Sequence, residues 1–204
     1  MRSCPASMKF NEALLVVDVQ NDFCPGGALG VREGDKIVSA INKYIELFSK
    51  KGLPVFATRD WHPKKTSHFK EFGGVWPTHC IQNTKGAEFH PGLRLPKEVI
   101  LIYKGMDPAK DSYSAFQAED QNGTGLPELL KVSGVEEIYI AGLATDYCVR
   151  FTTADAIKSG FKVKVLADAI KGVNLKPGDS EEAIEEMVKN GATMITLKDI
   201  ENKL

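Results

Sequence analysis

The amino-acid sequence predicts an α/β protein, a three-layer doubly wound fold around a central, mostly parallel sheet of six strands. Six short apolar runs alternate with longer segments of helical periodicity. This alternation is typical of parallel sheets covered by helices on both faces. The length of 204 residues suits one domain with a sizeable core. We therefore expect a single domain over residues 1–204, with a flexible tail at 1–10.

The six apolar runs are the expected strands. In chain order they cover residues 12–19, 53–60, 98–104, 136–142, 161–168 and 192–197. Each has the length of a typical strand and is bounded by polar or turn-forming residues.

Three segments between these runs have the features of helices. Residues 34–52 place large apolar side chains on one face and end in lysines and a glycine, as a helix C-terminus commonly does. Residues 145–160 and 179–191 begin at Thr or Asp and stop at Gly. Residues 61–97 lack periodicity and contain both tryptophans, so we expect an ordered functional loop there.

Composition excludes several classes of partner. The 26 basic and 27 acidic residues nearly cancel, which gives no electrostatic reason to expect nucleic acid or a membrane surface. No apolar run could cross a bilayer, and the first ten residues lack the apolar core of a secretory signal, so a cytoplasmic protein is expected. The four cysteines are scattered and do not suggest a disulfide framework.

Polar side chains stand at the ends of several expected strands. Asp18 ends the first run and Asp60 ends the second. Lys104 ends the third, and the segment after the fourth carries Cys148. Each alone has an ordinary structural interpretation, such as a turn cap, a solvated lysine or a buried thiol. Open parallel sheets bind ligands beyond the carboxyl ends of their strands, so the combination favours a catalytic site.

Cys148 has the surroundings of a nucleophile. It lies at the start of an expected helix, where the helix dipole and a lysine ammonium would help the thiol to ionise. Asp18 can accept the thiol proton while Lys104 orients the carboxylate, which supplies the parts needed for covalent acyl transfer. The preceding turn, GLAT, offers backbone N–H groups to an oxyanion. The sequence thus predicts a thiol that attacks a carbonyl carbon.

The loop at 61–97 carries a second group of reactive side chains. In "RDWHPKKTSHF" and "VWPTHC", Asp60, His62 and His79 supply a carboxylate and two imidazoles, and His68 is a candidate fourth ligand. Three protein ligands with open positions describe a catalytic metal better than a structural one. Histidines on a polar surface loop are the alternative interpretation, which the gathering of His62, His68 and His79 within 18 residues makes less attractive.

The motifs "DVQNDFCPGGAL", "RDWHP", "VWPTHC", "YKGMDPAKDSYSAF" and "GLATDYCV" occur in this order. Together they resemble the nicotinamidase family of the isochorismatase-like cysteine hydrolases, over residues 12 to about 170. The resemblance implies metal-dependent hydrolysis of nicotinamide to nicotinic acid and ammonia through a thioester, in NAD salvage. It also implies activity on pyrazinamide and a homo-oligomer.

The resemblance carries roles onto matching residues. It implies a catalytic triad of Asp18, Lys104 and Cys148, and a metal site of Asp60, His62 and His79. The peptide between Leu143 and Ala144 is expected to be cis, with the N–H groups of Ala144 and Cys148 forming the oxyanion hole. Residues implied to line the pyridine pocket are Phe23, Leu29, Trp76 and Tyr113, and a flat apolar slot suits an aromatic ring.

Two neighbouring positions depart from the family pattern. Members commonly have a histidine four residues after the first metal histidine and a serine two residues later, whereas this chain has Thr66 and His68 there. His68 is therefore a ligand candidate. Zinc is the first expectation for the divalent ion, and iron and manganese accept the same ligands. The alternative function is that of a metal-free relative acting on a carbamoyl or ureido substrate, which would not need the cluster at Asp60.

Overall fold

The computed structural model describes residues 10–201 and contains the predicted six-stranded sheet, in the order β3-β2-β1-β4-β5-β6. All five strand pairs are parallel, so the sheet is more regular than the mostly parallel one expected. The strands are β1 (Glu12–Val17), β2 (Val55–Asp60), β3 (Ile100–Lys104), β4 (Glu137–Leu143), β5 (Lys162–Lys171) and β6 (Thr193–Ile195). The expected tail lies, apart from Phe10, outside the described residues.

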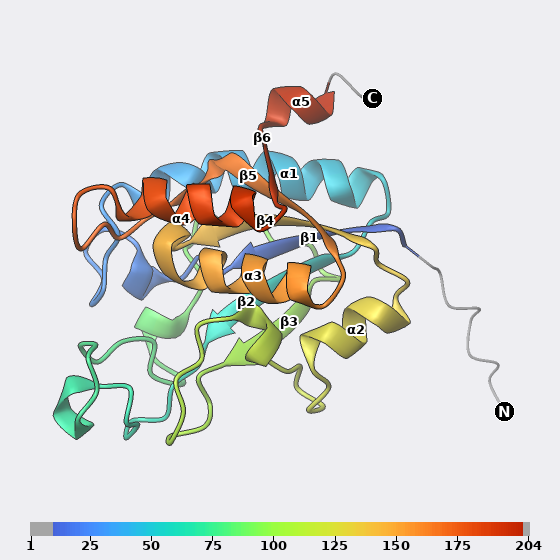
Figure 1. Ribbon diagram of the computed structural model, residues 1–204. Coiled ribbons are helices and arrows are strands. Elements are labelled where there is room, and N and C mark those ends of the chain that lie inside the picture. Colours follow the sequence, from blue (N-terminus) through green and yellow to red (C-terminus); the bar gives the residue numbers. More distant parts are fainter. Residues whose placement is uncertain (1–9, 202–204) are drawn as a thin grey trace, which may run out of the picture.

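Helices cover both faces of the sheet (Figure 1). The core on one face contains side chains of α1 (Val38–Lys50) and α5 (Leu197–Glu201). The core on the other contains side chains of α2 (Leu126–Val132), α3 (Arg150–Lys158) and α4 (Asp179–Lys189). This is the predicted three-layer arrangement. None of the helices in the described part of the chain is long and apolar enough to span a membrane.

The central strand β1 explains why the apolar runs are continuous. Leu14 and Val16 belong to one core, whereas Ala13, Leu15 and Val17 belong to the other, and all five are fully buried. A strand covered on both faces has no polar side, so its sequence does not alternate. Burying each large aliphatic side chain stabilises the fold by about 1.5–3 kcal/mol.

The helices differ from expectation in four places. Residues 34–52 begin with a 3₁₀ turn, η2 (Gly34–Ile37), before α1. Residues 145–160 begin with a π-helical turn, η6 (Thr145–Val149), which continues into α3. The sequence analysis missed α2 and α5, whose seven and five residues are too short for a helical period to stand out. Further 3₁₀ turns are η1 (Asn21–Phe23), η3 (Lys70–Phe72), η4 (Lys85–Ala87) and η5 (Ala115–Gln117).

The strand order reverses beside β1, and this creates the crevice used below. The chain runs outward from β1 through β2 to β3 and then returns to place β4 on the other side of β1. Such a switch point is where open α/β sheets bind ligands, beyond the carboxyl ends of the strands. Gly142 permits the close approach of β4 to β1, because it has φ +123° and a side chain there would collide with the backbone of Val17.

Candidate active site

The structure brings Asp18, Lys104 and Cys148 together at the carboxyl edge of the sheet. The Lys104 ammonium lies 2.9 Å from Asp18 Oδ2 and donates to Cys148 Sγ at 3.6 Å. Their relative exposures are 0%, 1% and 8%, so the group is shielded from water. Asp18 directly follows β1 and Lys104 ends β3, and Cys148 lies in η6 after β4. A strand end or a turn after a strand thus presents each group.

Burial controls the protonation of this group. It raises the pKa of the Cys148 thiol well above its ordinary value, against the opposing effect of the Lys104 ammonium. Burial also raises the pKa of Asp18, again opposed by Lys104. The Lys104 ammonium acts in the expected direction, but desolvation exceeds its effect. Cys148 stays a neutral thiol at rest and needs a base beside it to become a nucleophile.

Lys104 keeps its charge although it is buried. Burial alone would lower its pKa, but the carboxylates of Asp18 and Asp60 raise it well above the ordinary value. Asp60 in turn is subject to desolvation, yet the Lys104 ammonium and the neighbouring imidazoles of His62 and His79 hold its pKa well below the usual range. Two carboxylates facing one ammonium leave one negative charge in excess at this point of the interior.

Three histidines surround that excess charge. His62 Nε2 and His79 Nε2 lie 3.6 Å and 3.8 Å from Asp60 Oδ2. One ring nitrogen each from His62, His68 and His79 lies within 4.8 Å of the others, and all three side chains are buried. The residues fit a divalent cation: both ring nitrogens of His62 are buried without a hydrogen-bond partner, which is costly unless something binds there. The donor set of carboxylate and imidazole suits zinc, iron or manganese.

Backbone pairing holds the histidines in place within an irregular loop. His62 N–H donates to Cys80 O at 3.0 Å, and Gln82 N–H donates to His62 O at 2.9 Å, which fixes His62 beside His79. Gly105 packs against the His62 ring so closely that any side chain there would overlap it. The arrangement is therefore built into the fold of residues 61–97.

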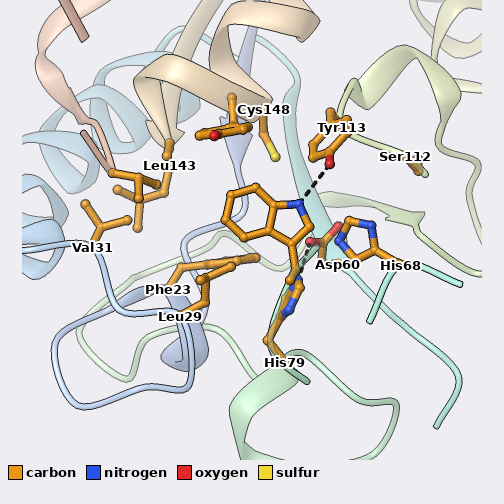
Figure 2. Close-up of a pocket in the computed structure, with 14 residues that line it drawn as sticks. Phe23, Leu29, Val31, Asp60, His68, His79, Ser112, Tyr113, Leu143 and Cys148 are labelled. Atoms are coloured by element: carbon orange, nitrogen blue, oxygen red, sulfur yellow. Dashed lines mark hydrogen bonds and ion pairs between the residues drawn. The ribbon is translucent and has the colours of Figure 1, made fainter. Parts of the chain in front are cut away.

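A pocket separates the cysteine from the histidines. Figure 2 shows Cys148 on one side of this pocket and Asp60, His68 and His79 grouped on another. All four residues expected to contact the substrate line it, namely Phe23, Leu29, Trp76 and Tyr113. Trp76 Nε1–H donates to the Tyr113 hydroxyl at 2.8 Å, which fixes the orientation of both rings. Mainly apolar walls with polar groups at two sides suit a flat ring that carries a polar substituent.

The turn after β4 also lines the pocket. Ala144 and Cys148, the two residues expected to form the oxyanion hole, both belong to its wall. The peptide between Leu143 and Ala144 is cis, as the family resemblance implies. Tyr147 and Val173 complete this wall, and the sequence analysis did not single them out. Tyr147 precedes the cysteine and packs edge-on against Trp76, with ring centroids 5.0 Å apart.

Two buried polar residues that the sequence analysis missed support the site. Thr58 Oγ1–H donates to Asp18 Oδ1 at 2.7 Å, and Gln20 makes hydrogen bonds with both backbone groups of Asp60. A signal for Thr58 is present in the sequence, because it lies two residues before Asp60 in one strand and so points to the same face. Gln20 has no such signal, since it acts across 40 residues of chain.

The family model for the isochorismatase domain matches residues 12–199, nearly the whole chain. The chain belongs to the isochorismatase family. The predicted resemblance and fold class are thereby confirmed.

Within the isochorismatase family, the chain is most usefully compared with nicotinamidases. It is 43% identical to a nicotinamidase of Escherichia coli, with 93% of this chain and 96% of that protein aligned. It is 40% identical to the nicotinamidase/pyrazinamidase of Mycobacterium tuberculosis, over 86% and 93% of the two chains. Among solved structures, the pyrazinamidase of Pyrococcus horikoshii in complex with zinc superposes with a TM-score of 0.85 at 50% identity, covering 92% of this chain and 99% of that one.

Proposed function

We propose that this protein is a metal-dependent cysteine amidohydrolase that converts nicotinamide and water to nicotinic acid and ammonia, and that also hydrolyses pyrazinamide. The observation that carries the proposal is the contact of Lys104 with both Asp18 and Cys148, together with a pocket that is lined by Cys148 on one side and by Asp60, His68 and His79 on another. The high identity to nicotinamidases over most of the chain supports the choice of substrate.

The first half of the reaction forms a thioester. Cys148 Sγ attacks the carboxamide carbon while Asp18 accepts the thiol proton, a transfer that the raised pKa of Asp18 favours and the raised pKa of the thiol opposes. Backbone N–H groups of Ala144 and Cys148 are proposed to stabilise the oxyanion. The carbon–nitrogen bond then breaks as Asp18 passes the proton to the leaving amide nitrogen, which departs as ammonia.

The second half regenerates the thiol. A water molecule enters in place of ammonia, and Asp18 takes one of its protons as the water oxygen attacks the thioester carbon. The carbon–sulfur bond breaks, the acid product forms, and the proton on Asp18 returns to the sulfur. Lys104 keeps its charge throughout, because two carboxylates hold its pKa high, and it fixes Asp18 beside the sulfur.

The residues proposed to hold the divalent metal are Asp60, His62, His79 and His68. Bound there, the metal would supply a Lewis-acidic contact for the pyridine nitrogen of the substrate and so orient the ring. Zinc is the proposed ion, supported by the zinc complex of the Pyrococcus horikoshii pyrazinamidase. Phe23, Leu29, Trp76 and Tyr113 are proposed to enclose the ring. The protein would act in NAD salvage in the cytoplasm, as a homo-oligomer.

Ammonia release from nicotinamide, pyrazinamide, benzamide and an N-carbamoyl amino acid tests this function, before and after chelation. We expect nicotinamide and pyrazinamide to be hydrolysed and chelation to abolish both activities. Benzamide lacks the ring nitrogen, and loss of one polar contact in a site built for it costs up to about 10⁴-fold in discrimination. Activity on the carbamoyl compound that survives chelation, with none on nicotinamide, would establish the metal-free alternative instead.

A further inference from the structure

The three histidines of the proposed metal cluster differ in the hydrogen-bond partners of their ring nitrogens. His79 Nδ1–H donates to the backbone carbonyl of Pro77 at 2.7 Å. His62 has no partner for either ring nitrogen. His68 Nδ1 contacts a carboxylate oxygen of Asp111, which lies 43 residues away in the chain. Among these three rings, His68 alone has a carboxylate outside the cluster on one of its ring nitrogens, and it occupies a position where this chain departs from its family's common pattern.

We propose that Asp111 is a positioning residue that makes His68 a permanent metal ligand. An aspartate that accepts a hydrogen bond from Nδ1–H selects the tautomer whose lone pair is on Nε2. Nε2 is then the nitrogen left to bind a cation in the cluster, where one ring nitrogen of His68 lies within 4.8 Å of one ring nitrogen each of His62 and His79. The carboxylate also increases the electron density that Nε2 offers to a cation. This inference rests on the proposed metal site and deepens it.

The segment that carries Asp111, residues 105–113, is tied to the histidine loop by contacts other than the aspartate. Ser67 N–H and the Thr66 hydroxyl both donate to Pro108 O, at 2.8 Å and 3.3 Å. The two segments therefore stay adjacent when the Asp111 side chain is removed. Asp111 is required for the orientation of one ring and not for the docking of the segment.

Exposure separates a positioning role from a structural one. The Asp111 side chain is 55% exposed, whereas that of His68 is 5% exposed. Removing an exposed carboxylate leaves no cavity, and surface ion pairs contribute little to stability. A substitution at Asp111 should therefore change the metal site while the melting temperature stays the same.

The same segment links the metal cluster to the rest of the pocket. The Ser112 carbonyl accepts a hydrogen bond from Lys104 Nζ at 3.3 Å, and the Tyr113 hydroxyl accepts one from Trp76. Asp111 thus precedes two residues that line the pocket wall. The contact between Asp111 and His68 therefore connects the proposed metal ligand His68 to this wall.

The test compares zinc affinity in the full-length protein, measured by competition with a chromophoric chelator, for wild type, Asp111→Ala, Asp111→Asn and Asp107→Ala. Asp107 is the matched control: it lies in the same segment, its side chain is 49% exposed, and its carboxylate accepts from Ala109 N–H and pairs with Lys110. We expect Asp111→Ala to bind zinc about 10- to 100-fold more weakly. Asp111→Asn should be intermediate, because its amide oxygen still accepts from Nδ1–H, and Asp107→Ala should match wild type.

A spectroscopic readout reports the tautomer itself. In ¹⁵N-labelled zinc-bound protein, His68 should carry its proton on Nδ1 in the wild type and lose that preference in Asp111→Ala. Equal zinc affinity in Asp111→Ala and Asp107→Ala, or a wild-type His68 protonated on Nε2, would overturn the role of Asp111 while leaving the proposed metal site in place. A wild-type protein that binds no zinc, iron or manganese would overturn both.

Discussion

The two halves of the candidate active site are held by different kinds of structure. Asp18 and Lys104 stand at the ends of β1 and β3, and Cys148 lies in the turn that follows β4. The histidines lie in residues 61–97, where only short 3₁₀ turns and isolated bridges occur. Asp60, at the end of β2, contacts both Lys104 and the histidines, so it joins the two halves.

The difference shows which half of the site needs a rigid scaffold. The nucleophile and its base must meet within hydrogen-bonding distance in a dry site, and strand ends in a packed sheet provide such rigidity. A metal site draws its ligands together through its own bonds, so an irregular loop is sufficient to carry it. The two halves should therefore respond separately to substitution, and the variants below test how separate they are.

The largest effect is expected from Cys148→Ala. Loss of the nucleophile should lower kcat by at least about a thousandfold in the ammonia-release assay, because no other group in the triad can form the thioester. Metal content, measured by elemental analysis, should stay the same as in wild type. Cys24→Ala is the control and should remain active. An acyl adduct found by mass spectrometry on Cys80 instead of Cys148 would contradict the assignment.

Asp18→Asn should reduce kcat by about 10²- to 10⁴-fold, the usual contribution of a general base. The variant should also change the thiol, since the negative charge of Asp18 helps to raise the pKa of Cys148. Removing that charge lowers the pKa, so alkylation of Cys148 should begin at lower pH than in wild type. An alkylation profile that matches wild type at every pH would show that Asp18 does not act on the sulfur.

His79→Ala should remove the metal and lower kcat/KM for nicotinamide by roughly a hundredfold or more, because a ligand is lost. The alkylation profile of Cys148 should stay the same, since His79 lies beside Asp60 and not beside the sulfur, which contacts Lys104. His90→Ala, in the same loop and outside the cluster, is the control. A shift of the Cys148 profile in His79→Ala would show that the two halves are coupled and not separate.

Thr58→Val should have the smallest effect. It deletes the 2.7 Å hydrogen bond to Asp18 Oδ1 and the 3.1 Å hydrogen bond from Asp18 N–H without a large change in volume, which costs about 1–3 kcal/mol of unfolding free energy and about tenfold in kcat. Thr153→Val is a matched control, because Thr153 is equally buried and its hydroxyl has no partner. It should be neutral or stabilising. Equal kcat in the two variants would mean that Thr58 does not position Asp18.

Part of the site could be predicted because it follows strand order. Asp18, Asp60 and Lys104 end three predicted strands, and parallel strands bring their carboxyl ends to one edge. The histidines were found through their gathering in one loop. Gln20, Thr58 and Asp111 were missed, since each acts through a contact about 40 residues away that no local pattern records.

The sequence by itself determined the α/β class, the six strands and the residues that could react, because the periodicity of apolar side chains and the polar residues at strand ends are local properties. The tertiary structure alone decided the protonation of Cys148 and the setting of His68. The thiol is neutral because packing removes it from water, which outweighs the fields expected from its position in the chain. His68 faces the cluster because Asp111 reaches it from a distant segment. Desolvation and long-range contacts depend on how the elements pack, so they exist only once the chain has folded.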